Sequence, residues 1–151
     1  MVKQKVDIEV KKEKMVFSVG KRREAVARAR IRNGAGRVLI NDTPLDLWQP
    51  EYSRLKIREP LMLAEDLINN LDIKVSVRGG GNAGQSDAVR QAIAKALVYY
   101  YKDDKLKRKF LDYDRNLIVY DYRRTEPHKP SRSRQGARRH KQRSKRWVND
   151  R

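Results

Sequence analysis

The last 29 residues, 123–151, gather side chains suited to one kind of chemistry, the binding of phosphate. They contain 12 Lys or Arg and only two acids, Glu126 and Asp150. Arg binds phosphate through its planar fork of donors, and Lys binds it as a point charge. Trp147 and Val148 are the only large apolar residues here, so the segment cannot bury enough surface to offset the entropy of ordering itself. We therefore expect an extended tail that takes a fixed shape on a polyanion.

Three glycines form a second candidate site, because Gly79, Gly81 and Gly84 satisfy the spacing G-x-G-x-x-G. The motif follows a strand-like segment and precedes a helix-like one, as in a dinucleotide-binding loop. Small residues there let a phosphate approach backbone N–H groups at a helix N-terminus. A nucleotide-dependent enzyme is therefore one hypothesis. The alternatives are an RNA phosphate held by this loop and a connection that binds nothing.

Several features count against the enzyme. The acid expected about twenty residues after the glycines should end a second strand, whereas Asp103 and Asp104 open a charged, helix-like segment. Both histidines, His128 and His140, lie in the basic tail, and the chain has no cysteine. The absence of cysteine excludes disulfides, thiolate metal sites and thiol nucleophiles. We expect no catalytic residues, no metal and no cofactor.

The whole chain is strongly basic, with 37 Lys and Arg against 19 Asp and Glu and a formal net charge of +18. Outside the tail the count is still 25 against 17, so body and tail both favour a nucleic-acid partner. Residues 1–14 lack the apolar core of a signal peptide, and no apolar run reaches membrane-spanning length. We expect a cytoplasmic protein with no membrane partner. A free-standing DNA-compacting protein is a further hypothesis.

The first elements that must position these residues are strands. Residues 15–19 favour a strand, which the charged run 20–24 interrupts. Residues 25–32 alternate, with Ala and Ile on one face and three arginines on the other: Arg28, Arg30 and Arg32. Residues 33–36 contain turn-forming Asn and Gly, and 37–41 favour a returning strand. The pattern predicts a β-hairpin with one face of small residues and one cationic face.

Helices and further strands follow. Pro50 and Pro60 each stand where a helix can begin, which predicts two helical pieces. Residues 72–78 alternate as a strand, and an apolar stripe from Val89 to Tyr100 predicts the longest helix. A helical segment at 103–111 and a final strand at 116–120 complete the order. This order predicts an α+β sandwich, a mixed sheet with helices on one side. We divide the chain into a Lys-rich extension (1–14), a globular RNA-binding domain (15–122) and the basic tail (123–151).

Six blocks of sequence, in order, resemble a known family. They are Gly20–Arg28, Gly36–Asn41, Arg78–Gln85, Ala88–Leu97, Asp121–Arg124, and Gly136–Arg139 with Ser144–Arg146. With them the chain resembles the ninth protein family of the small ribosomal subunit (universal S-nine) from about Met15 to Arg146. The long form of its basic tail favours an archaeal type.

The resemblance implies a fold like the second domain of ribosomal protein S-five. It also implies a place in the head of the small subunit, bound to small-subunit rRNA beside neighbouring head proteins. The C-terminal tail of this family reaches the anticodon stem-loop of the peptidyl-site tRNA. Fully extended, 29 residues span on the order of 90 Å, which is long enough to leave the globular domain and enter an RNA cleft.

The expected RNA-binding residues fall into two groups. Those of the body are Lys21, Arg22, Arg23, Arg28, Arg30, Arg32, Arg78, Gly79, Gly80 and Gly81. Those of the tail are Arg123, Arg124, Lys129, Arg132, Arg134, Arg138, Arg139, Lys141 and Arg143. For each body arginine the alternative is a solvated side chain.

The tRNA-contacting role carries over to Lys145 and Arg146, which match the end of the family's tail. In this chain five residues follow, Trp147 to Arg151. They move the α-carboxylate away from Arg146 and add both Asp150 and an indole able to stack on a base. The alternatives are that the extension shifts the tRNA contact to Arg151 or that the extension is disordered.

Overall fold

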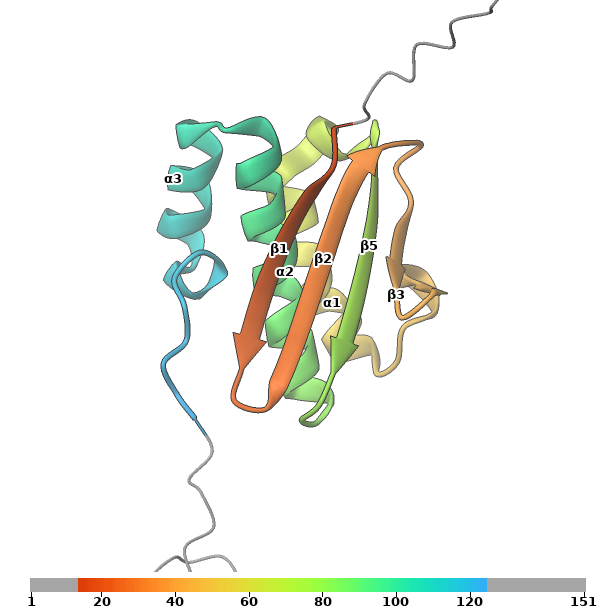
Figure 1. The fold of residues 1–151 in the computed structure, drawn as a ribbon, viewed down its shortest axis with the longest axis vertical. Helices are drawn as coiled ribbons and strands as arrows, with labels where there is room; N and C mark the ends of the chain where they lie inside the picture. Colours follow the sequence, from red (N-terminus) through yellow and green to blue (C-terminus); the bar gives the residue numbers. More distant parts are fainter. Residues whose placement is uncertain (1–13, 125–151) are drawn as a thin grey trace, which may run out of the picture.

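The computed structural model describes residues 14–124, which form a five-stranded mixed sheet with the α-helices on one side (Figure 1). The strand order is β1-β2-β5-β3-β4, and only the β3–β5 pair is parallel. This arrangement confirms the predicted α+β class with helices on one side of a mixed sheet. Of the predicted extension and tail, only Lys14, Arg123 and Arg124 lie within the described residues.

The strands are β1 Val16–Arg22, β2 Ala25–Asn33, β3 Val38–Ile40, β4 Thr43–Pro44 and β5 Leu71–Arg78. The α-helices are α1 Glu51–Ala64, α2 Asn82–Tyr101 and α3 Asp104–Tyr113. Short 3₁₀ helices occupy Leu45–Leu47, Glu65–Ile68 and Arg115–Leu117. Within residues 14–124, no helix is both long enough and apolar enough to cross a bilayer.

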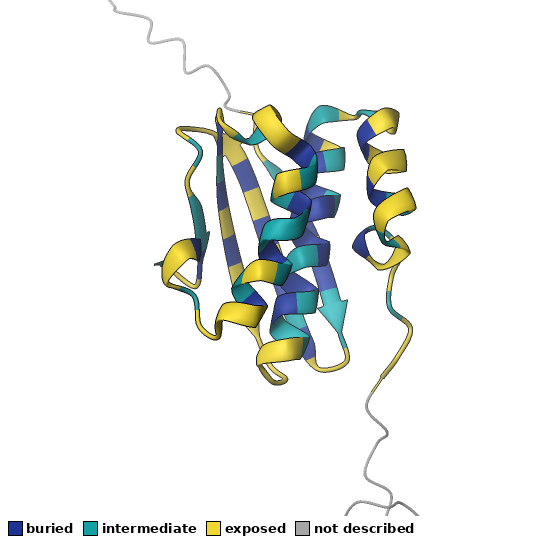
Figure 2. Cartoon of the chain, turned by 180° about the vertical axis from the view of Figure 1, so that it is seen from behind, coloured by how far each residue is buried: buried dark blue, intermediate teal, exposed yellow. Residues whose placement is uncertain are grey.

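The core lies between the sheet and α2. β2 and β5 alternate buried and exposed residues along their length (Figure 2), and the predicted apolar stripe of α2 is buried against them. The small side chains of β2 let α2 approach the sheet closely. Gly20 of β1 extends this close contact, because a Cβ there would overlap the carbonyl oxygen of Ala88 and lie 2.6 Å from the amide nitrogen of Ala92. The position therefore requires glycine.

The predicted hairpin between residues 25–32 and 37–41 is wrong. β5 lies between β2 and β3, and β2 instead forms its hairpin with β1 through a turn at Arg23 and Glu24. The physical reason is length, because β5 pairs along β2 from Val26 to Asn33 whereas β3 has three residues. The run 20–24 therefore does not interrupt the first strand, which continues to Arg22.

Two further predictions are wrong. The two expected helices form one, α1, with Pro60 inside it. Proline removes a helical hydrogen bond, but the Pro60 ring is fully buried, and this burial offsets the loss. Residues 116–120 do not form a strand. There the buried side chain of Gln91 bonds the carbonyl groups of Asn116 and Val119.

Candidate nucleic-acid interface

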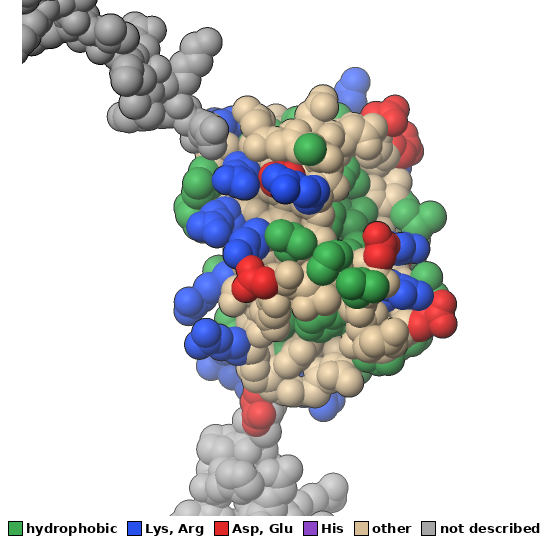
Figure 3. Space-filling view, turned by 90° about the vertical axis from the view of Figure 1, so that its right-hand side faces the viewer, with side chains coloured by type: hydrophobic (Ala, Val, Ile, Leu, Met, Phe, Trp, Pro, Cys, Tyr) green, Lys and Arg blue, Asp and Glu red, His purple; other side chains and the backbone are tan. Residues whose placement is uncertain are grey.

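The face of the sheet opposite the helices is open and cationic. Residues paired across neighbouring strands share a face, so the register places Phe17, Arg30, Lys74 and Leu39 in one row across four strands. The next row holds Val19, Arg28 and Ser76. Figure 3 shows Lys and Arg side chains gathered along the left-hand margin, where this open sheet face is seen edge-on. The predicted cationic face of residues 25–32 is therefore confirmed, with Arg28, Arg30 and Arg32 all exposed.

The cations of the open sheet face differ in their partners. Arg28, Arg30 and Arg78 form no ion pair with any residue between 14 and 124. Lys74 pairs with Asp42, an exposed contact of the kind that contributes little stability. The unpaired arginines remain available to an outside anion.

Asp72 organises one end of this face. Its carboxylate accepts hydrogen bonds from the guanidinium of Arg37 at 2.8 Å and from the backbone N–H of Ala35 at 3.1 Å, and it pairs with Arg32 at 3.5 Å. These bonds, with the Arg37 side chain as the largest cause, hold the pKa of Asp72 well below its usual range. A carboxylate that stays ionised keeps both guanidinium groups in place.

The β1–β2 turn and the glycine loop lie together at one end of the sheet, and the described chain leaves the domain at the same end (Figure 1). A Cβ on Gly79 would lie 2.5 Å from the carbonyl oxygen of Glu24 in the β1–β2 turn. Gly79 and Gly80 also have positive φ angles of 79° and 64°, a conformation that favours glycine. The close contact with the β1–β2 turn and the positive φ angles thus explain why positions 79 and 80 are glycine. Gly81, by contrast, borders open space. The fold brings Lys21, Arg23, Arg78 and Gly81 to one end of the molecule.

The glycine loop lacks the surroundings of a dinucleotide site. α2 is followed by α3 and a 3₁₀ helix, and within residues 14–124 no strand follows β5. Asp103, which would have to bind a ribose, instead caps α3, where its side chain accepts the backbone N–H of Lys105 at 2.8 Å.

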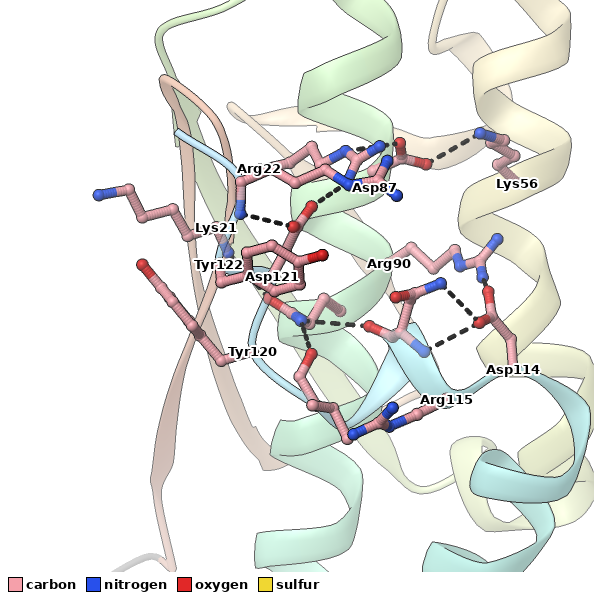
Figure 4. A pocket seen from close by; sticks show the side chains of 14 residues that line it. Lys21, Arg22, Lys56, Asp87, Arg90, Asp114, Arg115, Tyr120, Asp121 and Tyr122 are labelled. Carbon is pink, nitrogen blue, oxygen red and sulfur yellow. Dashed lines mark hydrogen bonds and ion pairs between the residues drawn. The ribbon is translucent and has the colours of Figure 1, made fainter. Parts of the chain in front are cut away.

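Arg22 differs from the other predicted arginines because its guanidinium is paired with two carboxylates of the domain, whereas Arg32 meets only Asp72 among residues 14–124. It contacts Asp121 and lies 3.6 Å from Asp87 of α2. In Figure 4, Arg22 reaches from β1 between these two carboxylates, and Lys56 of α1 meets Asp87 from the other side at 2.9 Å. This bond to Asp87 raises the pKa of Lys56. These side chains border a cavity of about 310 Å³.

Gln91, a residue that sequence reasoning did not assign to any site, lies beneath this cavity. Its side-chain oxygen accepts the backbone N–H of Lys21 at 2.9 Å. Its amide nitrogen donates to the carbonyl oxygens of Asn116 at 3.1 Å and Val119 at 2.6 Å. One buried side chain thereby joins β1, α2 and the segment that precedes the basic tail. The sequence signal was a polar residue directly before the apolar pair Ala92 and Ile93.

The predicted tail residues are mostly outside the described part of the chain. Arg123 and Arg124 are exposed, and the backbone N–H of Arg123 donates to Asp121 at 2.9 Å. The remaining tail predictions, for rRNA and tRNA, concern residues outside those that the structure describes: Lys129, Arg132, Arg134, Arg138, Arg139, Lys141, Arg143, Lys145 and Arg146.

Comparison with known proteins adds an independent finding. Residues 20–146 match the family model described as Ribosomal protein S9/S16. The chain is 49% identical over 131 residues to the small ribosomal subunit protein uS9 of Methanococcus maripaludis strain C7, which covers 87% of this chain and 98% of that relative. It is 47% identical, over the same shares, to the uS9 protein of Methanococcus vannielii. The β1–β2 turn, the glycine loop and the tail up to Arg146 all lie inside the matched region.

Proposed function

The chain belongs to the Ribosomal protein S9/S16 family, and on this premise we propose that it binds small-subunit rRNA through its open sheet face and reaches the peptidyl-site tRNA with its tail. As a member of this family it is a ribosomal protein of the small subunit, located in the cytoplasm, and not an enzyme. In the proposed arrangement the domain lies in the head of the subunit, beside neighbouring head proteins.

The observation that carries the proposal is that two positively charged side chains lie directly opposite each other on neighbouring strands of the open sheet face. Arg30 lies directly opposite Lys74, and Arg28 follows on the same face of β2. Like charges directly opposite each other destabilise a sheet. Phosphates bound over these side chains remove that repulsion and release the counterions of the RNA. An RNA partner therefore gives these arginines a role that the isolated domain does not.

The end of the molecule that holds the β1–β2 turn and the glycine loop supports the same proposal. Lys21, Arg23 and Arg78 lie at the end of the sheet where the described chain leaves the domain (Figure 1), and Arg123 lines the same cavity as Lys21. The tail then adds ten more Lys or Arg within residues 125–151. A basic sequence that continues from the domain into the tail suits one extended RNA partner, and in this proposal Lys145 and Arg146 contact the tRNA.

The test is binding of the full chain to small-subunit head rRNA over a range of salt concentrations. Each phosphate contact contributes about 0.7 to 0.9 to the slope of log K against log salt. The double variant Arg28→Gln, Arg30→Gln should therefore reduce the slope by roughly 1.5.

Lys107→Gln with Arg108→Gln is the matched control, because both are exposed cations of α3 on the helix side and the pair removes the same charge. An unchanged slope in the double variant would contradict the proposed interface. Co-sedimentation with small ribosomal subunits in high salt separates the proposal from a DNA-compacting role, which predicts no such association.

A further inference from the structure

We propose that the open sheet face binds unpaired rRNA nucleotides, with one base stacked on Phe17 and a second in the adjacent hollow beside Leu39. The inference rests on the proposed function and specifies the form of RNA that the face recognises. Neither Phe17 nor Leu39 carries charge, so charge alone does not assign them to the interface.

The first observation is an apolar stripe along the outer side of β1. Met15, Phe17 and Val19 are 43%, 67% and 53% exposed, at alternate positions that share one face. Single exposed apolar residues are ordinary, but a contiguous group marks a binding surface. Phe17 is the member with the largest flat face.

The second observation is the register, which places this stripe beside arginines. Phe17 pairs with Arg30 and Val19 pairs with Arg28. An apolar row next to a cationic row suits single-stranded RNA, whose bases stack on aromatic rings while its phosphates bind cations. A duplex presents its phosphates but keeps its bases stacked inside, so it has nothing to place on Phe17.

The third observation is a hollow of about 280 Å³ on the same face. It is lined by the apolar residues Met15, Leu39 and Ile73, by one acid, Asp72, and by four cations: Arg30, Arg32, Arg37 and Lys74. Asp72 fixes the guanidinium of Arg37 through contacts of 2.8 Å and 3.3 Å. A guanidinium plane held in this way can stack on a base. The hollow therefore suits a second unpaired nucleotide.

The test uses the full chain with two labelled probes, a short oligoadenylate and an abasic oligoribonucleotide of the same length and charge. Both probes present phosphates, and only the first presents bases. The wild-type protein should bind the oligoadenylate more tightly than the abasic chain. Phe17→Ala should weaken oligoadenylate binding roughly 5- to 100-fold and leave abasic binding unchanged.

Two substitutions at the same position separate stacking from simple apolar contact. Phe17→Tyr should keep the preference for bases, and Phe17→Leu should lose it as Ala does. Tyr113→Ala is the control, because Tyr113 is an exposed aromatic residue of α3. The proposal is overturned if Phe17→Ala keeps the full preference, or if Leu retains it as well as Tyr, which would point to apolar contact in place of stacking.

The outcomes also separate this inference from the proposed function. If the Arg28→Gln, Arg30→Gln variant loses affinity for the abasic probe while Phe17→Ala changes nothing, the face binds phosphates but not bases. Phosphate binding would then stand and base stacking would be overturned. If neither set of variants alters binding to either probe, both proposals fail for this face.

Discussion

Gln91 accepts the backbone N–H of Lys21 at 2.9 Å, and so occupies a donor on the outer edge of the sheet. Within residues 14–124, β1 is the edge strand next to β2, and its outward N–H groups have no neighbouring strand. The same carboxamide donates to Asn116 and Val119. The segment before the tail is thus attached to the sheet edge through a side chain and not through strand pairing.

Replacing Gln91 by Leu should lower the free energy of unfolding by about 3 kcal/mol, because three backbone groups lose their partner in a buried place. Urea denaturation gives this value, and hydrogen exchange at residues 116–122 should accelerate. Gln85→Leu is the control, since the Gln85 side chain forms one hydrogen bond within residues 14–124, donating to the carbonyl oxygen of Gly79 at 3.2 Å. Equal effects of the two variants would argue against the joining role of Gln91.

Gly20→Ala should destabilise the fold by about 1–3 kcal/mol, because the added methyl group overlaps the backbone of α2 at Ala88 and Ala92. Gly81→Ala should change stability by less than about 1 kcal/mol, because its Cβ would meet open space. Thermal and urea unfolding of the two variants make the comparison. A tolerated alanine at Gly20 would contradict the close contact between β1 and α2.

The stability contributed by Asp72 should depend on pH. Its pKa is lowered in the folded protein from 3.8, so the contribution is complete above that value and is lost as the pH falls through the folded pKa. Asp72→Asn should therefore destabilise the protein at pH 7 and only somewhat less at pH 3, which is below the unfolded pKa but still above the folded one. Asp66→Asn, at an exposed 3₁₀ position, should show no such difference. The measurement is urea unfolding at both pH values.

Removing residues 125–151 should flatten the salt dependence of rRNA binding. If roughly six of the ten cations removed engage phosphates, the slope of log K against log salt should lose about 4 to 5 units. Circular dichroism checks that the remaining domain is folded. A truncated chain that binds rRNA with the full slope would show that the tail does not supply these contacts.

Lys145 and Arg146 are expected to contact the peptidyl-site tRNA. Assembled small subunits carrying Lys145→Ala and Arg146→Ala should bind this tRNA more weakly by at least about tenfold, because two charge-assisted contacts are lost. Lys105→Ala with Lys107→Ala removes the same charge from α3 and should leave tRNA affinity unchanged. Unaltered affinity after the first pair of substitutions would argue against the contact.

Sequence patterns predicted the faces of elements better than their partners. The alternation in residues 25–32 and 72–78 is local, so the buried and cationic faces followed from it directly. Strand pairing is not local, and the turn-forming residues 33–36 suggested a hairpin that β5 displaces. Length decided the pairing, and no short window of sequence contains that information.

In the candidate site, too, the features set by local sequence were predictable and those set by distant contacts were not. The exposed Arg28 and Arg30 followed from a two-residue period. The role of Gln91 did not, because its partners lie 25 and 28 residues further along the chain. Residues 116–120 are rich in β-branched and aromatic types, which favour strands. The buried side chain of Gln91 instead donates hydrogen bonds to the carbonyl oxygens of Asn116 and Val119. Tertiary contacts thus overrode the local preference for a strand.

The position of β5 in the middle of the sheet sets an order on events during synthesis. β1 to β4 leave the translating ribosome before β5 does, because synthesis runs from the N-terminus. Until Leu71–Arg78 arrives, the inner edge of β2 has no partner and the β3–β4 ribbon has nothing to join. A nascent chain that stops short of β5 therefore exposes a long strand edge beside an unfilled core, and such edges invite pairing with other chains. The sheet is therefore completed only late in the synthesis of the domain.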